Sequence, residues 1–169
     1  MGEYWDVLNE QGEKTGKRLR RTTYNQLASG EYHLVVHIWI VNSKGEFLIQ
    51  RRSHNRIPMP GEWAATGGSV FSGEDSQAAA IRELREEMGI RVLPGEIHYL
   101  RQFKRKNSII DFWWARVDAP LNSLCLEPKE VEEAKWVTAE TLRTMIQRKE
   151  FHNYGRSYFS AVFSLITQR

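Results

Sequence analysis

The segment from residue 67 to residue 90, GGSVFSGEDSQAAAIRELREEMGI, constrains the fold of this chain more than any other stretch. Its alanines and long unbranched side chains favour an α-helix. Within it, Ile81, Leu84 and Met88 recur at the i, i+3, i+7 spacing of residues that line one face of a helix. We therefore predict a helix over residues 73–88, with this apolar stripe buried against a core.

Both ends of this segment carry residues that are typical of helix termini. Ser72 and Asp75 have the S-x-x-D spacing of a capping box, in which polar side chains bind free backbone N–H groups of the first turn. Gly89 suits the left-handed conformation that commonly ends a helix. These signals predict that the helix starts close to residue 73 and stops at residue 88.

The same helix gathers an unusual number of carboxylates on one side. Glu83, Glu86 and Glu87 stand at i, i+3 and i+4, so they converge on one patch, with about 6 Å of axial rise between the first and the last. An all-oxygen cluster suits Mg²⁺ or Mn²⁺, which bind phosphate oxygens and activate water. The alternative is a solvated face stabilised by an i, i+4 pair between Arg82 and Glu86.

The spacing of the charged residues distinguishes these two explanations. Gly68 is followed after five residues by Glu74, and after seven more by the run RELREEMGI at residues 82–90. This spacing reproduces every fixed position of the Nudix box, G-x5-E-x7-R-E-(apolar)-x-E-E-x-G-(apolar). The chain therefore resembles the Nudix hydrolases. The resemblance implies an α+β fold, an α/β/α sandwich with a mixed sheet and a catalytic loop-helix-loop over residues 68–90.

The resemblance also implies roles for individual residues. Arg82 would hold a glutamate of the box in place, and Glu74 would support the loop or a second ion. Glu83 and Glu87 would be the principal metal ligands, and Glu86 a further ligand or the base that takes a proton from water. The implied catalytic residues are Glu86 and Arg82, and the implied metal-binding residues are Gly68, Glu83, Glu86 and Glu87.

The expected activity is hydrolysis of a diphosphate linkage with Mg²⁺ (or Mn²⁺) as cofactor. The substrate would be a nucleoside-diphosphate-linked compound or a similar small metabolite, and the sequence leaves the group attached to the diphosphate open. Arg51 and Arg52, which end a predicted strand, and Arg56 in the following loop are the nearest cationic candidates for binding it. Strand alternation turns Arg51 and Arg52 to opposite faces, and Arg51 is the preferred candidate.

A second resemblance concerns the N-terminal third of the chain. EYWDVLNEQGEKTG at residues 3–16 and HLVVHIWIVNSKGEFLIQRRS at residues 33–53 are similar to isopentenyl-diphosphate isomerases and their Nudix relatives. That isomerase branch has a catalytic cysteine where this chain has Gly67 and Gly68, and Cys125 lies outside the box. We therefore expect a hydrolase with an isomerase-like N-terminus. Two alternatives are an isomerase-like enzyme and a regulatory domain that binds a diphosphate ligand without cleaving it.

The remaining elements follow from local patterns. We expect a hairpin at residues 33–41 and 46–52, a loop at 53–63 and a short strand at 64–70. Further expected strands lie at 96–105, 108–118 and 133–138, with helices from Thr138 and at 157–168.

Several other residues of chemical interest are assigned structural roles. Trp113 and Trp114 are adjacent in a predicted strand and are expected to pack in the core. His33 and His37 face the same side of a strand but lie about 13 Å apart, too far for a shared metal ion. We expect them to be packed or hydrogen-bonded. A further acidic stretch, expected to be an exposed loop, contains Glu130, Glu132 and Glu133.

Whole-chain properties set the remaining expectations. At 169 residues the chain is long enough for one domain, with about residues 1–30 as an N-terminal extension. It shows neither a secretory signal nor an apolar run of membrane-spanning length, and its one cysteine fits a reducing compartment, so we expect a cytoplasmic location. The net charge of +3 favours anionic ligands without indicating a stable nucleic-acid partner. A homodimer is compatible with the sequence.

Overall fold

The structure is a computed structural model that describes residues 3–22 and 27–168. Its strands are β1 (Tyr4–Leu8), β2 (Lys14–Arg20), β3 (His33–Val41), β4 (Phe47–Arg52), β5 (Trp63–Ala64), β6 (Thr66–Ser69), β7 (Ile97–Lys104), β8 (Ser108–Arg116) and β9 (Val131–Val137). Its helices are α1 (Ser76–Met88), α2 (Ala139–Gln147) and α3 (Arg156–Ser164). Short 3₁₀ turns lie at Pro94–Glu96, Leu121–Ser123 and Leu165–Thr167.

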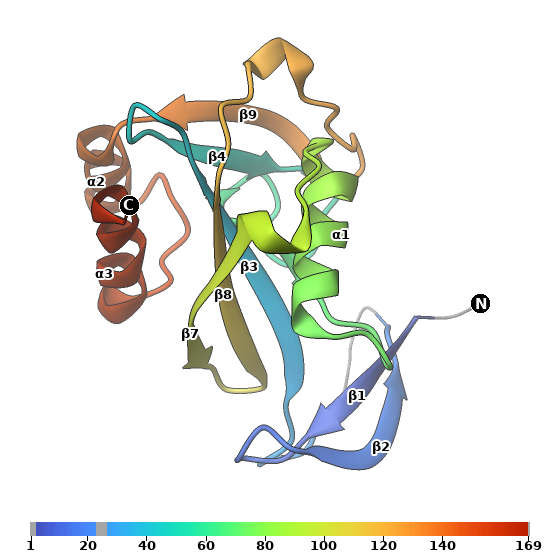
Figure 1. Ribbon diagram of the computed structural model, residues 1–169. Helices are drawn as coiled ribbons and strands as arrows, with labels where there is room; N and C mark the ends of the chain where they lie inside the picture. The colour runs from blue at the N-terminus through green and yellow to red at the C-terminus, as the bar shows by residue number, and fades with distance from the viewer. Residues whose placement is uncertain (1–2, 23–26, 169) are drawn as a thin grey trace.

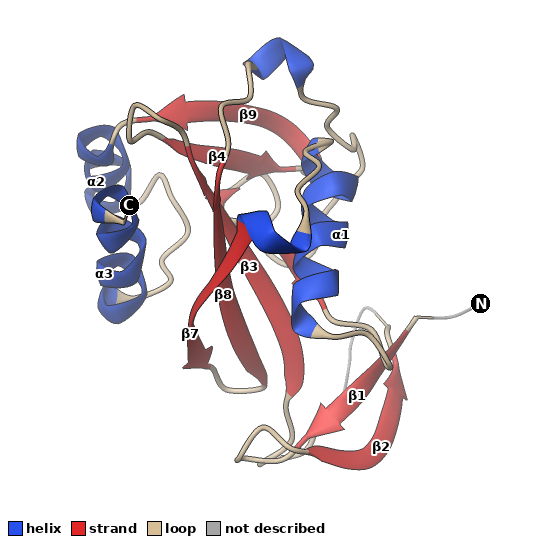
Figure 2. Ribbon diagram, in the orientation of Figure 1, coloured by secondary structure: helices blue, strands red, loops and turns tan. Residues whose placement is uncertain are grey.

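A mixed sheet of seven strands forms the middle layer. Its main path runs β5-β4-β3-β8-β7, while β6 pairs with β3 and β9 pairs with β4. The β3–β8 pair is parallel and the other pairs are antiparallel. Helix α1 covers one face, and α2 and α3 lie together on the other (Figures 1 and 2). The predicted mixed-sheet sandwich is confirmed.

The two halves of the core follow from strand alternation in β3. Ile38 and Ile40 point to the helix α1 side, where they join the cluster that contains Leu84. Trp39 points to the opposite side and packs with Tyr158 of helix α3. All five side chains are almost fully buried. Because both faces are apolar, β3 is a central strand covered by helices on each side.

Helix α1 starts later than its sequence indicated. The residue that caps it is Asp75, whose side chain accepts a hydrogen bond from the backbone N–H of Ala78 at 2.8 Å. Ser72 makes no cap, because its hydroxyl donates instead to Asp6 of β1 at 2.6 Å. The predicted start near residue 73 was therefore wrong by three residues. Gly89 ends the helix at φ 71°, as expected.

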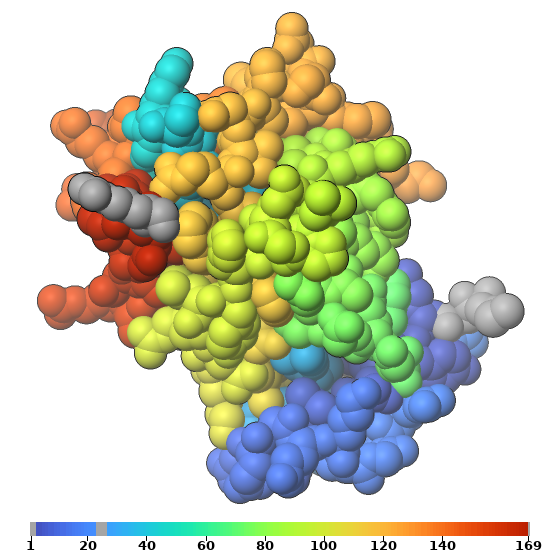
Figure 3. Space-filling view, in the orientation of Figure 1, coloured from blue at the N-terminus to red at the C-terminus, as the bar shows by residue number. Residues whose placement is uncertain are grey.

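The N-terminal extension folds as a hairpin of β1 and β2, which form a two-stranded sheet of their own. Ser72 N donates to Tyr4 O at 2.7 Å, and Trp5 stacks on His33 with ring centroids 4.0 Å apart. Figure 3 shows the hairpin as the blue lobe beside the green segment that leads into α1. Among the described residues, no helix combines the length and apolarity that a membrane crossing needs.

Strands β3 and β4 separate soon after their turn, and this separation makes room for a site. They pair only at Ile40↔Leu48 and Val41↔Phe47. Farther along β3, the neighbour becomes β6, with His37 opposite Gly67. Strand β4 pairs instead with β5 and β9. The sheet therefore opens beside Gly67, next to the helix that carries the clustered glutamates.

Candidate active site

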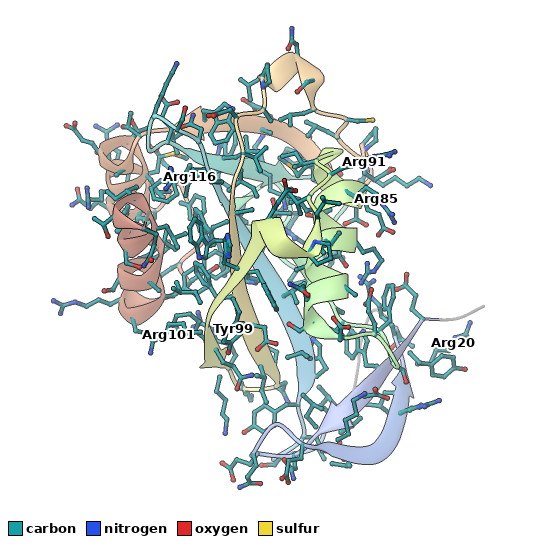
Figure 4. All side chains as sticks on the ribbon, viewed as in Figure 1. Arg20, Arg85, Arg91, Tyr99, Arg101 and Arg116 are labelled. Carbon is teal, nitrogen blue, oxygen red and sulfur yellow. The ribbon has the colours of Figure 1, made fainter. Side chains whose placement is uncertain are left out.

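The glutamates of helix α1 line a cavity of about 270 Å³, called the carboxylate pocket below. Helix spacing brings Glu83, Glu86 and Glu87 to its wall, as the sequence predicted. Arg82 lines it too, whereas Arg85 and Arg91 point outward from this end of the molecule (Figure 4). The pocket also contains Arg56, Glu127 and Glu130, which come from two other segments of the chain.

Arg82 forms hydrogen bonds with several groups in and beside the carboxylate pocket. Its guanidinium binds both oxygens of Glu74, with Nε to Oε1 at 2.8 Å and Nη2 to Oε2 at 2.9 Å. Nη1 donates to Glu83 at 2.7 Å and to Glu86 at 3.2 Å, and Nη2 also reaches the carbonyl of Ser69 at 3.0 Å. Burial alone would lower the pKa of Arg82, but its bonds to Glu74 and Glu83 raise it overall. The arginine stays charged and fixes the positions of three carboxylates.

Two of the glutamates are buried with too little positive charge around them. Glu83 is 8% exposed and Glu87 is 3% exposed. Burial, and then the charge of Glu83, raise the pKa of Glu87 to about 8, although Gln50 Nε2 donates to its Oε2 at 2.9 Å. Burial also raises the pKa of Glu83. Such a pair is suited to a cation that would neutralise both carboxylates.

Gly68 occupies a position that no other residue could fill without rearrangement. A Cβ atom built there would collide with the carboxylate of Glu83. At Gly67 the same atom would overlap the carbonyl oxygen of Val36. The backbone of β6 therefore lies directly against the carboxylate pocket, and glycine is required for this close approach.

The donor chemistry of the pocket fits a hard divalent cation. All candidate ligands are oxygen atoms, and Glu130 Oε2 is buried without a hydrogen-bond partner among the described residues. Over residues 3–22 and 27–168, no three His, Cys, Asp or Glu side chains already stand together as a metal site. Arg82 binds oxygens of both Glu83 and Glu86.

Glu130 was expected in an exposed acidic loop, and the structure corrects this expectation. Its carboxylate lies in the carboxylate pocket and binds Arg56 at 2.6 Å. The loop reaches the pocket because the backbone N–H of Glu127 donates to the carbonyl of Glu87 at 3.1 Å. Glu132 and Glu133 are exposed, as expected. No local sequence signal marks Glu127 or Glu130, because a contact between distant segments places them.

The preferred cationic residue, Arg51, does not face the pocket. Gln50 points to Glu87, so alternation along β4 turns Arg51 to the other face of the sheet. There its guanidinium pairs with Glu133 at 3.1 Å. Of the three candidate arginines, the structure brings Arg52 and Arg56 to the site. The prediction of opposite faces was correct, but the choice between the two arginines was not.

A larger cavity of about 800 Å³ adjoins the carboxylate pocket. The two share Glu3, Arg21, Arg56 and Ser69 in their walls. The face of β3 that carries His33 and His37 forms its floor, and Trp5 of the N-terminal hairpin lines it as well. Most of the residues that line it were not assigned to a site from the sequence.

The residues that were expected to have structural roles are buried or hydrogen-bonded in the structure. Trp113 and Trp114 are buried, and Trp113 Nε1 donates to Ser76 at 2.8 Å. His33 and His37 are hydrogen-bonded through Nδ1, to the carbonyl of Asn107 and the hydroxyl of Tyr158. Cys125 is exposed and lines neither the carboxylate pocket nor the larger cavity.

This arrangement, with a glycine strand, an arginine-organised helix and clustered glutamates on a mixed-sheet sandwich, agrees with the family match of the chain. The NUDIX domain family matches residues 31–160, so the chain belongs to the Nudix family. A protein described as an uncharacterized Nudix hydrolase of Listeria monocytogenes is 39% identical over 153 residues, covering 90% of this chain and 89% of that one. The chain is thus an enzyme of the Nudix hydrolase class.

Other relatives cover different parts of the chain. Isopentenyl-diphosphate Delta-isomerase of Escherichia coli is 33% identical over 98 residues, covering 57% of this chain and 53% of the isomerase. The crystal structure of DR0079 from Deinococcus radiodurans matches with a TM-score of 0.76 and 25% identity, over 98% of both chains. The MutT protein of Methanosarcina mazei matches with a TM-score of 0.60 and 29% identity, over 80% of this chain and 93% of that one.

Proposed function

We propose that this enzyme uses Mg²⁺, or Mn²⁺, to hydrolyse the diphosphate linkage of a nucleoside-diphosphate-linked compound or a similar small metabolite. The observation that carries the proposal is the pair of buried carboxylates, Glu83 and Glu87, beside the backbone of Gly68. Burying like charges together is costly unless a cation joins them. A divalent metal ion would supply the missing positive charge and would bind the oxygens of the diphosphate.

Each residue of the carboxylate pocket has a defined task in this proposal. Glu83, Glu87, Glu86 and the backbone of Gly68 would hold the metal, which when bound polarises phosphate oxygens and lowers the pKa of water. Glu86 is the most exposed of these carboxylates, at 51%, so it is accessible to water and is the candidate for taking up a proton. Arg82 positions Glu83 and Glu86 and does not itself react.

The arginines at the junction of the two cavities would bind the phosphates. Arg56 lines both cavities, and its Nε is buried without a hydrogen-bond partner among the described residues. Arg52 lines the larger cavity beside it. Guanidinium groups bind phosphate oxygens through paired, charge-assisted hydrogen bonds. A diphosphate at this junction would place one phosphorus near Glu86 and direct the attached group into the larger cavity.

Isomerase chemistry is disfavoured because the backbone at Gly67 and Gly68 leaves no room for a cysteine side chain. A cysteine at either position would push its Cβ into Val36 O or Glu83. Cys125 sits beside Gly89, the residue that ends helix α1, and lines neither cavity. A regulatory, non-catalytic role would be favoured by loss of a box glutamate, and all of them are present. A cytoplasmic location and a homodimer stay predictions from the sequence.

The proposal is tested by incubating a panel of diphosphate compounds with Mg²⁺ or Mn²⁺ and measuring the products of hydrolysis, which are phosphate from a terminal diphosphate and phosphomonoesters from an internal one. The panel includes nucleoside diphosphates, nucleotide sugars, dinucleotides, thiamine diphosphate and isopentenyl diphosphate. The native protein is compared with Glu86→Gln and Glu87→Gln. We expect metal-dependent formation of these products by the native protein and its loss in both variants.

The matched control is Glu140→Gln, which removes an exposed helical glutamate from α2. It should retain native turnover. Native protein that binds a compound with Mg²⁺ but never cleaves it would contradict hydrolysis and favour the regulatory alternative. Conversion of isopentenyl diphosphate without phosphate release would favour the isomerase.

A further inference from the structure

The floor of the larger cavity is one face of strand β3. His33, Val35 and His37 alternate along the strand and all line the cavity. From His33 to His37 the floor is about 13 Å long. This length exceeds what a diphosphate needs, so the floor contacts the group attached to it. The following inference rests on the proposed function of the adjoining pocket.

A chain of buried polar groups determines which proton His37 presents to this cavity. Trp39 Nε1 donates to the hydroxyl oxygen of Tyr158 at 2.8 Å, and that oxygen lies 2.7 Å from His37 Nδ1. Indole nitrogen is only a donor, so the tyrosine oxygen is an acceptor in the first contact. Both Trp39 and Tyr158 are almost completely buried.

The tyrosine hydrogen then has one acceptor available. Among the described residues, the hydroxyl of Tyr158 has two hydrogen-bond partners, and the second is His37 Nδ1. A buried hydroxyl seldom leaves its hydrogen unused, so Tyr158 donates to Nδ1. Nδ1 is therefore the unprotonated nitrogen of a neutral imidazole, and the ring hydrogen is on Nε2. Nε2 has no partner among the described side chains and is left for a ligand in the cavity.

The surroundings of His37 keep the ring neutral. Burial lowers the pKa of His37 to about 3, and the charges of Arg105, His152 and Arg52 act in the same direction. At neutral pH the imidazole is therefore an uncharged N–H donor. A neutral donor favours a neutral acceptor such as a carbonyl oxygen or a ring nitrogen.

Other groups on the cavity wall are donors as well. The hydroxyl of Tyr154 accepts from the backbone N–H of Ala65 at 3.2 Å, which leaves its own hydrogen to donate, and the Tyr154 ring lies 5.0 Å from His37. Trp5 is 7% exposed, and its Nε1 has no acceptor among the described residues. Arg52 is 8% exposed, and within the described chain its side chain bonds only through Nε, to Pro58 O at 3.0 Å.

We infer that His37, held as the Nε2–H tautomer by Tyr158 and Trp39, is a specificity-determining residue that selects substrates whose group beyond the diphosphate carries hydrogen-bond acceptors. Tyr154 and Trp5 present further donors to the same group. Carbonyl oxygens and ring nitrogens of a nucleobase, or the oxygens of a sugar, meet this requirement. A purely apolar group does not, because it would leave these buried donors without partners.

The tautomer is tested directly by ¹⁵N NMR of histidine-labelled, metal-free protein. The expected spectrum of His37 shows a protonated Nε2 and an unprotonated Nδ1 at pH 7. In Tyr158→Phe the donor to Nδ1 is lost, so the signal should move toward a mixture of tautomers. Tyr32→Phe removes the hydroxyl of another buried tyrosine, one that does not line the cavity, and should leave the His37 signals in place. A native ring protonated on Nδ1 would overturn the inference, even if Tyr158→Phe fails to fold.

Recognition is tested with UDP, a sugar diphosphate and isopentenyl diphosphate as probes, each with Mg²⁺ and with Glu86→Gln protein to slow cleavage. UDP and the sugar diphosphate differ in where their acceptors lie, so the one that shifts the His37 Nε2 signal identifies the source. Isopentenyl diphosphate has no acceptor beyond its phosphates and should not shift it. Adding His37→Leu should reduce the preference for the acceptor-bearing probe roughly 3- to 10-fold, the effect of one neutral hydrogen bond.

The outcomes separate this inference from the proposed function. Binding of both UDP and the sugar diphosphate without a change at His37, or an equal change with isopentenyl diphosphate, would overturn the recognition role while leaving hydrolysis intact. An absence of both binding and cleavage across the panel would count against the proposed function. The tautomer, measured without metal or ligand, would still be decided.

Discussion

The two adjoining cavities of this protein present opposite chemistry to a ligand. The carboxylate pocket is lined by oxygen acceptors from Glu83, Glu86 and Glu87. The larger cavity presents N–H and O–H donors from residues such as His37 and Tyr154. One pocket therefore suits a cation, and the other suits a group rich in acceptors. The difference suggests that cleavage and recognition are carried by separate parts of one site.

The two cavities also differ in how their residues come together. Glu83, Glu86 and Glu87 lie within about one turn of one helix, so their proximity is a property of the helix. The donors of the larger cavity come from β1, β3, the end of β4 and the segment before α3. The arginines that line both cavities, Arg21 and Arg56, lie at their junction. Substitutions in the two cavities should therefore affect different kinetic constants.

The largest effect is expected in the carboxylate pocket, from Glu86→Gln. If Glu86 takes the proton from water, kcat should fall by roughly 10²- to 10⁴-fold. The Glu86 side chain is half-exposed, so the free energy of unfolding should change little. Steady-state kinetics and urea unfolding measure the two quantities. A kcat within tenfold of the native value would assign the proton transfer to another group.

At the junction of the two cavities, Arg56→Gln should weaken substrate binding by roughly 10- to 100-fold, the effect of losing a charge-assisted hydrogen bond. The matched control is Arg51→Gln, because Arg51 lies on the other face of β4 and pairs with Glu133. The measurement is KM for the cleaved compound, with kcat recorded alongside. Equal effects of the two substitutions would contradict the placement of the arginines.

In the larger cavity, acid should destabilise the folded protein through His37. Its pKa of about 3 in the folded state lies below the ordinary 6.5, so the unfolded chain binds an extra proton between these values. His37 therefore leaves the free energy of unfolding unchanged above pH 6.5. It lowers this free energy by about 1.4 kcal/mol per pH unit as the pH falls from 6.5 toward 3. Urea unfolding between pH 7 and pH 4 should show this slope as the difference between the native protein and a His37→Gln variant, because the raised pKa of Glu87, about 8, gives the native protein an opposite contribution over part of this range.

The substitution His37→Gln should remove this part of the slope. His33, whose pKa burial lowers to about 4, adds a separate contribution that stays in the variant. Substitution of the exposed His98 is the control for losing a histidine at the surface. A native slope in the His37→Gln protein would show that the ring titrates normally and is not enclosed as described.

The smallest effect concerns the start of helix α1, which carries the pocket glutamates. Asp75→Ala should lower the free energy of unfolding by about 1 kcal/mol, because it removes the helix cap. Amide hydrogen exchange at Ala78 should become faster. Ser72→Ala should weaken the contact with Asp6 and leave the Ala78 amide protected. Faster exchange at Ala78 in the Ser72 variant would support the capping box that the sequence predicted.

Patterns within single elements were readable from the sequence because they depend on local geometry. The β3 strand was predicted at residues 33–41 and found at His33–Val41. The end of α1 at Gly89 followed from the left-handed conformation that glycine adopts freely. The convergence of Glu83 and Glu87 required only the helical repeat. The hairpin of β1 and β2 was not assigned, although Gly12 and the apolar alternation at Trp5 and Val7 were available signals.

The sequence by itself therefore determined the helix, the central strands and the glutamates of the box, since residues three or four apart on a helix are neighbours in any fold. Tertiary structure alone decided that Arg52 and Arg56 rather than Arg51 face the site, and that Glu130 joins it. It also decided the bond between His37 and Tyr158, which lie 121 positions apart. The physical reason is that the divergence of β3 from β4 and the docking of α3 bring together segments whose contacts no local repeat encodes.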